Sequence, residues 1–146
     1  MFVDADVLFA GSAAPSEHSA SHVILQMGEI TLLDCVTSQQ AIAEVERNLA
    51  EKLPAKLPTF RLLVSRCLRV VSDPDASDLP PYTGQADSAD LPILVAALRE
   101  GCLYLVTFNT RHFHPASVAI NIQRPGDFIL TVRERLSALA GKDEED

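Results

Sequence analysis

The segment Asp87-Ser-Ala-Asp-Leu-Pro-Ile-Leu-Val-Ala-Ala-Leu98 is the part of this sequence that most strongly determines the fold. Its second half, Ile93–Leu98, is apolar on nearly every side of a helix, which is typical of a helix buried in the centre of a domain. Asp87 or the serine after it can cap this helix, and Pro92 is tolerated in its first turn. The apolar run Tyr104–Phe108 predicts a strand shortly afterwards. A buried helix leading into a strand indicates an α/β domain.

Strands and helices are predicted to alternate along the rest of the chain. The predicted strands are a first one from Phe2 that ends near Asp4 and is followed by a turn, then Thr31–Val36, Leu68–Val71, Tyr104–Phe108 and Val118–Ile122. The other predicted helices begin at Ser16 or Glu17, run from Ser38 to about Leu53, cover Phe60–Cys67, and run from Pro125 to about Leu139. Ser72–Ala86 is predicted to be a loop.

This alternation predicts an α/β fold, a three-layer sandwich with a mostly parallel central sheet of about five strands and helices on both faces. No linker or repeat divides the sequence. We therefore expect one domain over residues 1–140, followed by an acidic and frayed tail over residues 141–146.

Composition excludes several classes of protein. The chain has 146 residues, 47% of them hydrophobic and 22% charged, which suits one domain of ordinary size. Its 20 acidic and 12 basic residues give a net charge of -8, which argues against a protein that coats nucleic acid by charge alone. Apolar runs such as Ile93–Leu98 are too short to cross a bilayer, so no membrane association is expected.

The cysteine pattern and the first residues bear on cellular location. Asp4 and Asp6 interrupt the first apolar run, so a secretory signal is not expected. Cys35, Cys67 and Cys102 lie more than thirty residues apart, which is unlike a zinc site or a disulfide framework. These features favour a cytoplasmic protein with three free thiols.

Several polar residues lie where an α/β sheet binds its ligands, beyond the carboxyl ends of the strands. Asp4 ends the first strand and Asn109 follows the fourth, while Asp87 and Asp90 begin the helix that leads into the fourth strand. Glu44 lies in the helix after the second strand. Carboxylates gathered in one cleft repel each other and need a cation, and hard oxygen ligands select Mg²⁺ or Mn²⁺.

Five motifs lie in the same order and spacing as in a known family. They are Phe2-Val-Asp-Ala-Asp-Val-Leu8, Ser38 followed six residues later by Glu44, the Asp87–Leu98 segment with Asp90, Leu105-Val-Thr-Phe-Asn109 followed by Arg111-His112-Phe113, and Pro125-Gly-Asp-Phe128. Together they cover nearly the whole chain. In this respect the sequence resembles the PIN-domain ribonucleases, especially the VapC-like toxins of type II toxin–antitoxin systems.

The resemblance implies a Mg²⁺- or Mn²⁺-dependent endoribonuclease, a hydrolase that cleaves single-stranded or structured RNA and leaves 5′-phosphate and 3′-hydroxyl ends. The implied catalytic residues are Asp4, Glu44, Asp90 and Asn109, and the implied metal ligands are these four and Asp6. Supporting roles are implied for Asp87, Thr107 and Ser38, and RNA contacts for Arg111 and His112. The implied partners are an RNA substrate, an antitoxin protein and a second copy of the chain, with the helical hairpin Gln40–Cys67 as a candidate contact surface.

The chain departs from the family pattern at two positions. Asn109 stands where many members have aspartate, and a neutral amide binds a cation more weakly. Asp6 stands where the family often has asparagine or serine, which restores one charge. Asn109 and the low basic content favour an alternative, a degenerate PIN domain that binds RNA or a protein without cleavage, whereas Asp4, Glu44 and Asp90 oppose it. A metal-dependent DNA flap nuclease is less favoured, because no long insertion is evident.

Each acid also has a structural explanation. Asp4 can cap a turn after the first strand. Asp87 and Asp90 can complement a helix dipole, an effect of roughly 0.3–1 kcal/mol. Glu44 can belong to a solvated helix face, and Glu46, two residues later, points to another side of the same helix.

Overall fold

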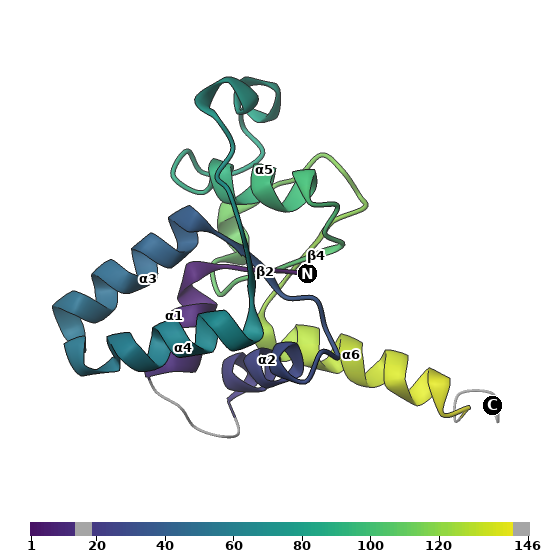
Figure 1. Cartoon of the computed structure of the whole chain (residues 1–146). Coiled ribbons are helices and arrows are strands. Elements are labelled where there is room, and N and C mark those ends of the chain that lie inside the picture. Colours follow the sequence, from purple (N-terminus) through teal and green to yellow (C-terminus); the bar gives the residue numbers. More distant parts are fainter. Residues whose placement is uncertain (14–18, 142–146) are drawn as a thin grey trace.

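A five-stranded sheet forms the middle layer of the protein, and all its strand pairs are parallel (Figure 1). The computed structural model describes residues 1–13 and 19–141. In spatial order the strands are β3, β2, β1, β4 and β5. Their bounds are β1 (Phe2–Val3), β2 (Val36–Ser38), β3 (Arg69–Val71), β4 (Tyr104–Val106) and β5 (Asn121–Gln123).

Helices cover both faces of this sheet, as predicted for a three-layer α/β sandwich. The helices are α1 (Ala5–Ala13), α2 (Ala20–Glu29), α3 (Gln39–Lys52), α4 (Leu57–Cys67), α5 (Leu91–Arg99) and α6 (Pro125–Leu139). Four short 3₁₀ turns accompany them, η1 (Pro54–Lys56), η2 (Ala76–Asp78), η3 (Pro80–Tyr82) and η4 (Thr110–His112). In Figure 1, α5 lies above the sheet and α2 and α6 lie below it, while α3 and α4 form a hairpin at the side. No helix in the described ranges is long and apolar enough to cross a membrane.

The strand β1 and the helix α5 are buried in the centre of the domain, as their apolar sequences suggested. Phe2 and Val3 of β1 are both 0% exposed, because the strand lies in the middle of the sheet with helices on each face. Most of α5 is buried too, from Leu91 through Ala97 with the exception of Pro92. The predicted central helix is therefore confirmed. It begins later than the serine or aspartate cap that the sequence suggested, since Asp90 occupies the position before its first residue.

Ser38 has the capping role expected of it. Its buried hydroxyl accepts a hydrogen bond of 3.3 Å from the backbone N–H of Ala41 in the first turn of α3. The predicted helix from this serine to about Leu53 is confirmed as α3, which buries Val45 and Leu49 on one side. Because α3 starts directly at the end of β2, its first turns lie at the carboxyl edge of the sheet.

The structure corrects the expectation of a turn after the first strand. A helix, α1, begins there instead, because the backbone oxygen of Asp4 accepts hydrogen bonds from Val7 and Leu8. This helix buries residues on more than one side, so its apolar pattern has no clean helical period. The alternation of apolar and acidic residues in this segment therefore did not indicate its helical structure.

Two predicted strands also lie later in the chain than expected. The predicted strand Thr31–Val36 begins only at Val36, because Thr31 adopts φ 61° and the chain turns through this region. The predicted strand Val118–Ile122 is Asn121–Gln123, and the side chain of Val118 is 97% exposed. The loop Ser72–Ala86 is confirmed, with η2 and η3 inside it.

The remaining predictions concern the starts of two helices, the C-terminal tail and the cysteines. Helix α4 begins at Leu57, one turn before the predicted Phe60. The expected starts of the second helix at Ser16 or Glu17 and the tail residues 142–146 lie outside the described residues; α2 begins at Ala20 after its cap Ser19. Each of the three cysteines is a free thiol, and two of them are buried.

Candidate active site

The candidate site lies at the carboxyl ends of β1 and β4, which are paired neighbours in the sheet. Asp4 follows β1 directly, and its backbone N–H donates a 3.0 Å hydrogen bond to the carbonyl of Val106, the last residue of β4. Thr107 follows β4 directly. The register of these two strands thus places Asp4 beside Thr107, although they are far apart in the sequence.

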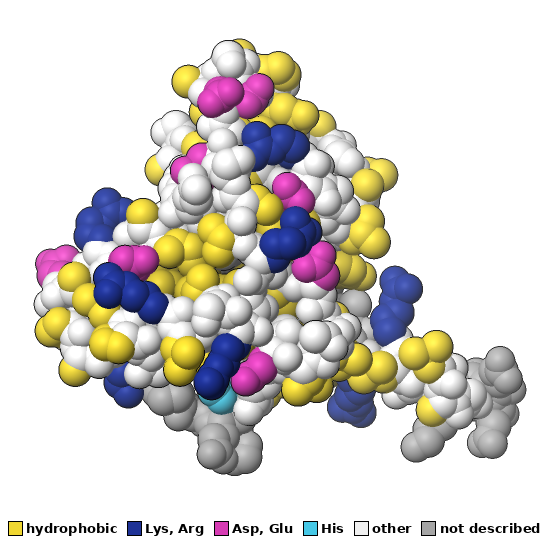
Figure 2. Space-filling view, viewed as in Figure 1, with side chains coloured by type: hydrophobic (Ala, Val, Ile, Leu, Met, Phe, Trp, Pro, Cys, Tyr) yellow, Lys and Arg dark blue, Asp and Glu magenta, His cyan; other side chains and the backbone are white. Residues whose placement is uncertain are grey.

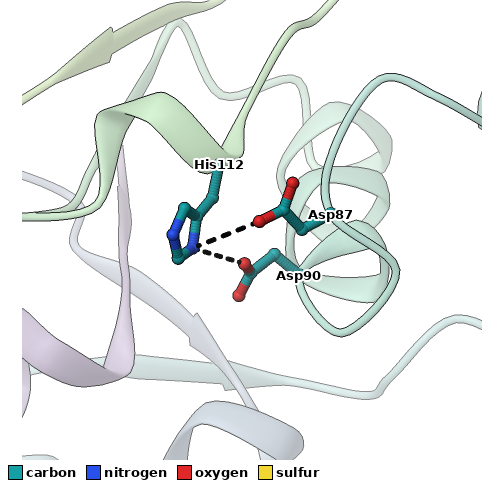
Figure 3. A group of neighbouring side chains, drawn as sticks. All are labelled: Asp87, Asp90 and His112. Atoms are coloured by element: carbon teal, nitrogen blue, oxygen red, sulfur yellow. Dashed lines mark hydrogen bonds and ion pairs between the residues drawn. The ribbon is translucent and has the colours of Figure 1, made fainter.

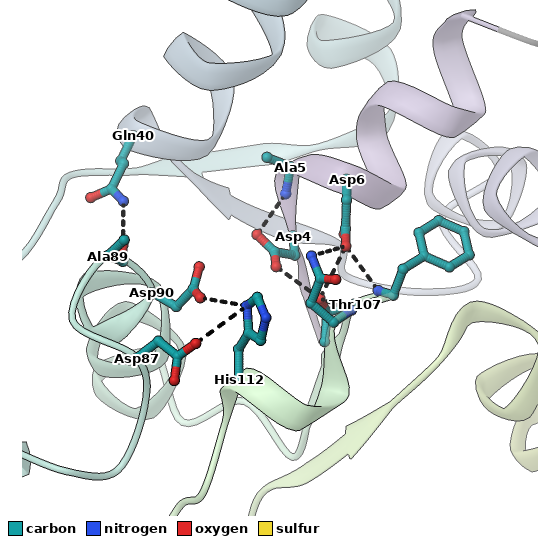
Figure 4. Close-up of polar contacts among 11 residues, drawn as sticks. Asp4, Ala5, Asp6, Gln40, Asp87, Ala89, Asp90, Thr107 and His112 are labelled. Atoms are coloured by element: carbon teal, nitrogen blue, oxygen red, sulfur yellow. Dashed lines mark hydrogen bonds and ion pairs between the residues drawn. The ribbon is translucent and has the colours of Figure 1, made fainter.

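Hydrogen bonds hold the carboxylate of Asp4 in one orientation (Figure 4). Its Oδ2 accepts a 2.9 Å bond from the hydroxyl of Thr107, and its Oδ1 accepts a 2.7 Å bond from the backbone N–H of Ala5. Thr107 is 0% exposed and Asp4 is 6% exposed. Thr107 therefore contacts the acid directly, at the position expected of a supporting residue.

Asp6 projects from the first turn of α1 toward the same strand end. Its Oδ2 accepts bonds of 3.0 Å from the backbone N–H of Phe108 and 3.2 Å from the side-chain amide of Asn109. Its Oδ1 is buried and has no hydrogen-bond partner among the described residues. Asp6 and Asn109 are thus brought together, with the asparagine as donor and the aspartate as acceptor.

The electrostatics of this strand end are unfavourable to charge. The pKa of Asp4 is raised to about 7, mainly by burial and then by the neighbouring charge of Asp6, against the lowering effect of the hydrogen bond from Thr107. Burial is also the main cause that raises the pKa of Asp6. Within residues 1–13 and 19–141, no lysine or arginine forms an ion pair with Asp4, Asp6 or Glu44.

Glu44 on α3 faces these acids. The pKa of Glu44 is raised mainly by burial and then by the charge of Asp90, with a smaller contribution from Asp6. Glu46, the competing glutamate of this helix, lies on another side and pairs with Arg61 at 3.3 Å. The structure therefore brings Glu44, and not Glu46, to the acidic site.

Asp87 and Asp90 meet His112 on the other side of the site (Figure 3). The Nδ1 atom of His112 lies 3.0 Å from Oδ2 of Asp90 and 3.7 Å from Oδ2 of Asp87. The carboxylate of Asp90 makes no capping hydrogen bond to α5, so it is directed at the site and not at the helix end. His112, expected only to contact RNA, is thus part of this acidic group.

Two of the residues predicted from the sequence, Ser38 and Arg111, lie at the margin of the acidic site. Ser38 caps α3 and so acts on the helix that carries Glu44. Arg111 lies in η4 next to His112 and is exposed. The spacing of His112 from Asn109, one 3₁₀ turn, was the sequence signal that could have placed the imidazole with the acids.

The donor set fits a hard divalent cation. The carboxylates of Asp4, Asp6, Glu44 and Asp90 approach one another without an ion-paired lysine or arginine among the described residues, and the buried Oδ1 of Asp6 lacks a hydrogen bond there. Such oxygen donors suit Mg²⁺ or Mn²⁺. A hollow of about 480 Å³ lies elsewhere: Met1 and Leu103, which precede β1 and β4, line it at the opposite edge of the sheet. None of the carboxylates of the candidate site lines this hollow.

Comparison with known proteins supports the predicted fold and family. The PIN domain family matches residues 1–111. A search of curated proteins gave no match. A chain in the crystal structure of VapBC2 from Rickettsia felis, bound to a DNA fragment from their promoter, has a similar fold, with a TM-score of 0.59 and 16% sequence identity over 84% of this chain and 96% of that chain. These results confirm the PIN fold that the motifs indicated, and the chain belongs to the PIN domain family.

Proposed function

We propose that this PIN domain is a Mg²⁺- or Mn²⁺-dependent endoribonuclease that cleaves single-stranded or structured RNA in the cytoplasm, as the toxin of a toxin–antitoxin pair. The observation that carries the proposal is the meeting of Asp4, Asp6, Glu44 and Asp90 at one sheet edge without an ion-paired lysine or arginine among the described residues. Structural acids are normally solvated, paired or used as caps. Asp4, Asp6 and Glu44 are partly desolvated and form no ion pair among the described residues, and Asp90, which contacts His112, adds its charge to theirs.

Asp4, Glu44 and Asp90 would hold the cation, with Asp6 and Asn109 beside them. A bound divalent ion neutralises phosphodiester charge and generates a nucleophile from water at neutral pH. Thr107 keeps the Asp4 carboxylate oriented. Asp6 keeps Asn109 in place by accepting a hydrogen bond from the side-chain amide of Asn109. Glu44 lies on α3, across the site from the aspartates that precede α5. A substrate phosphate would therefore enter between α3 and the start of α5.

The surface favours recognition by a few contacts. Lysine and arginine side chains are scattered singly over the face drawn in Figure 2 and do not form a stripe. Unpaired segments of a folded RNA, whose bases are accessible, fit such a surface better than a long duplex. Arg111 is exposed near the site and remains a candidate for an RNA phosphate.

The acidic site also suits a protein inhibitor. A basic or aromatic segment of an antitoxin would neutralise and cover it, and the likeness to a chain of the VapBC2 complex supports such a partner. We further propose that the protein forms a homodimer, with the α3–α4 hairpin as the candidate contact surface.

The alternative is a PIN domain that binds RNA or a protein without cleavage. Asn109 favours it, because its side chain is neutral and its amide N–H donates a hydrogen bond to Asp6. Cleavage activity separates the two functions, whereas RNA binding alone does not.

The decisive experiment incubates the purified chain with a pool of structured RNAs in Mn²⁺ or in EDTA, beside Asp90→Asn. Asp127→Asn, an acid on α6 outside the site, is the matched control. Discrete cuts that need Mn²⁺, persist in Asp127→Asn and disappear in Asp90→Asn support the nuclease. Cuts that persist in Asp90→Asn contradict the assigned site, and metal binding without any cuts favours the binding-only alternative.

A further inference from the structure

The imidazole of His112 lies against the two aspartates just before α5, and the three side chains are close enough together to bind one metal ion (Figure 3). Its Nδ1 is 3.0 Å from a carboxylate oxygen of Asp90 and 3.7 Å from one of Asp87, and the three ligand atoms all lie within 4.8 Å of one another. Neighbouring ligands on one octahedral cation with bonds near 2.1 Å are roughly 3 Å apart. Small side-chain rotations would therefore place all three atoms on one ion.

A purely structural bond is the rival explanation, in which the imidazole fastens η4 to the segment before α5. Backbone contacts already do this. The N–H of Asp87 donates a 2.9 Å hydrogen bond to the carbonyl of His112, the N–H of His114 donates a 2.6 Å bond to the carbonyl of Gln85, and Ala86 forms an antiparallel bridge with Phe113. The backbone that carries His112 is therefore held in place without its imidazole, and the side-chain contact is not needed for this attachment.

Asp90 links this group to the rest of the acidic site. Its charge acts on Glu44, Asp4 and Asp6, so these carboxylates lie within electrostatic reach of it. Its carboxylate is not engaged at the helix end. Figure 4 shows His112 between Thr107 and the two aspartates that precede α5.

We propose that His112 ligates a divalent cation through Nδ1, together with Asp87 and Asp90, and that this nitrogen ligand makes the centre favour Mn²⁺ over Mg²⁺. The proposal rests on the proposed function, since the ion is one that the nuclease site holds. Imidazole is a good ligand for transition metals, whereas Mg²⁺ prefers oxygen donors and its own water. With Nδ1 on the metal, the proton of the neutral ring is on Nε2. The half-exposed ring then keeps that N–H in water.

The test measures metal binding directly. Mn²⁺ is titrated into the purified full chain by calorimetry, and the bound ion is examined by electron spin-echo envelope modulation, which detects a coordinated ¹⁴N nucleus. His112→Ala removes the nitrogen ligand and His112→Asp replaces it with oxygen. His114→Ala, an exposed histidine two residues away, is the matched control. Circular dichroism melting shows whether each variant is folded.

The wild-type protein and His114→Ala are expected to show the nitrogen coupling at one ion per chain or more. In His112→Ala the coupling disappears and Mn²⁺ affinity falls by about tenfold or more, as on loss of a metal-site interaction. In His112→Asp the preference for Mn²⁺ over Mg²⁺ becomes smaller. A bound Mn²⁺ without nitrogen coupling, or equal affinity in folded His112→Ala, overturns the proposal and leaves the nuclease intact. Nitrogen-coupled Mn²⁺ without RNA cleavage supports the proposal and contradicts the nuclease.

Discussion

At the scale of single residues, the surroundings of Asp4 strongly disfavour the negative charge of its carboxylate. Burial raises the pKa of this carboxyl from 3.8 to about 7, with the charge of Asp6 adding to the shift. A carboxyl that binds its proton more tightly in the folded state than in the unfolded state makes stability fall as pH rises between these two values. The metal-free protein is therefore destabilised at neutral pH by the group that its proposed chemistry needs.

Asp4→Asn is expected to stabilise the protein in EDTA. Each pKa unit corresponds to about 1.4 kcal/mol, so a shift of this size costs at most about 4 kcal/mol once the carboxyl is fully ionised. The gain should be largest at pH 8 and smaller at pH 5, where the native carboxyl is mostly protonated. Urea unfolding at both pH values measures it, with the exposed Glu134→Gln as control. Equal stability of Asp4→Asn and wild type at pH 8 would contradict this prediction.

Thr107 is expected to stabilise the same carboxylate. Thr107→Val keeps the shape but removes the hydroxyl that donates to Asp4 and accepts from the backbone N–H of Asn109. Leaving such buried groups unsatisfied costs about 1–3 kcal/mol. Urea unfolding should therefore show a loss for Thr107→Val that is greater at pH 8 than at pH 5, and much less loss for Thr107→Ser. A valine variant as stable as the serine variant would show that the hydroxyl is dispensable.

The sequence predicted only part of the site at this scale. The predicted strand ends and helix starts place Asp4, Glu44 and Asp90 at one edge of the sheet, because the carboxyl ends of parallel strands share one edge. The position of His112 depends on the short 3₁₀ turn η4 and on the long-range bridge between Ala86 and Phe113, and neither feature leaves a periodic pattern in the sequence. The motif spacing from Ser38 had already favoured Glu44 over Glu46, and in the structure Glu46 pairs with Arg61 on another side of α3.

At the scale of secondary structure, the buried helix α5 was the most predictable element and the strands the least. Strands of two or three residues carry little pattern, and their bounds depend on pairing: Tyr104 pairs with Asn121, which excludes the apolar but exposed Val118 from β5. Helix α1 escaped prediction because its burial on several sides removes the amphipathic period. Turns of the chain, strand pairing and burial decided where β5 begins and that α1 is a helix. These are properties of the folded chain and not of the local sequence.

Close packing between helices gives a prediction at this scale, at Gly28 near the end of α2. A Cβ added there would lie 2.5 Å from the backbone oxygen of Cys67, the last residue of α4, and 3.1 Å from Sγ of Cys35. Overpacking of this kind costs about 1–3 kcal/mol, against a helix-propensity gain of about 1 kcal/mol for alanine. Gly28→Ala should therefore unfold at lower urea concentration than wild type.

Gly126→Ala is the matched control for this substitution. Gly126 lies in the first turn of α6, and a Cβ added there meets nothing within 4 Å. It should be neutral or stabilising by up to about 1 kcal/mol. A Gly28→Ala protein as stable as Gly126→Ala would mean that α2 and α4 can separate without cost.

At the scale of the whole molecule, the acidic site links stability to metal. A chain of net charge -8 that gathers four carboxylates at one edge is less stable without a counter-ion. An ion that binds only the folded state stabilises it by about 1.4 kcal/mol at ten times its dissociation constant. For a domain of this size that raises the melting temperature by roughly 3–6 °C. Mn²⁺ should produce this increase and EDTA should abolish it, with potassium chloride of equal ionic strength giving a smaller one.

The pair of glutamates on α3 tests whether this stabilisation comes from the site or from general screening of charge. Glu44→Gln removes a carboxylate that faces Asp90, whereas Glu46→Gln removes one that pairs with Arg61 on another side of the helix. Both variants change the net charge equally, so screening affects them alike. We expect Glu44→Gln to melt at a higher temperature than wild type in EDTA and to gain less from Mn²⁺, while Glu46→Gln keeps the full gain. Equal Mn²⁺ gains in the two variants would show that the ion acts on the overall charge of the protein, and Glu44 would lose its place among the metal ligands.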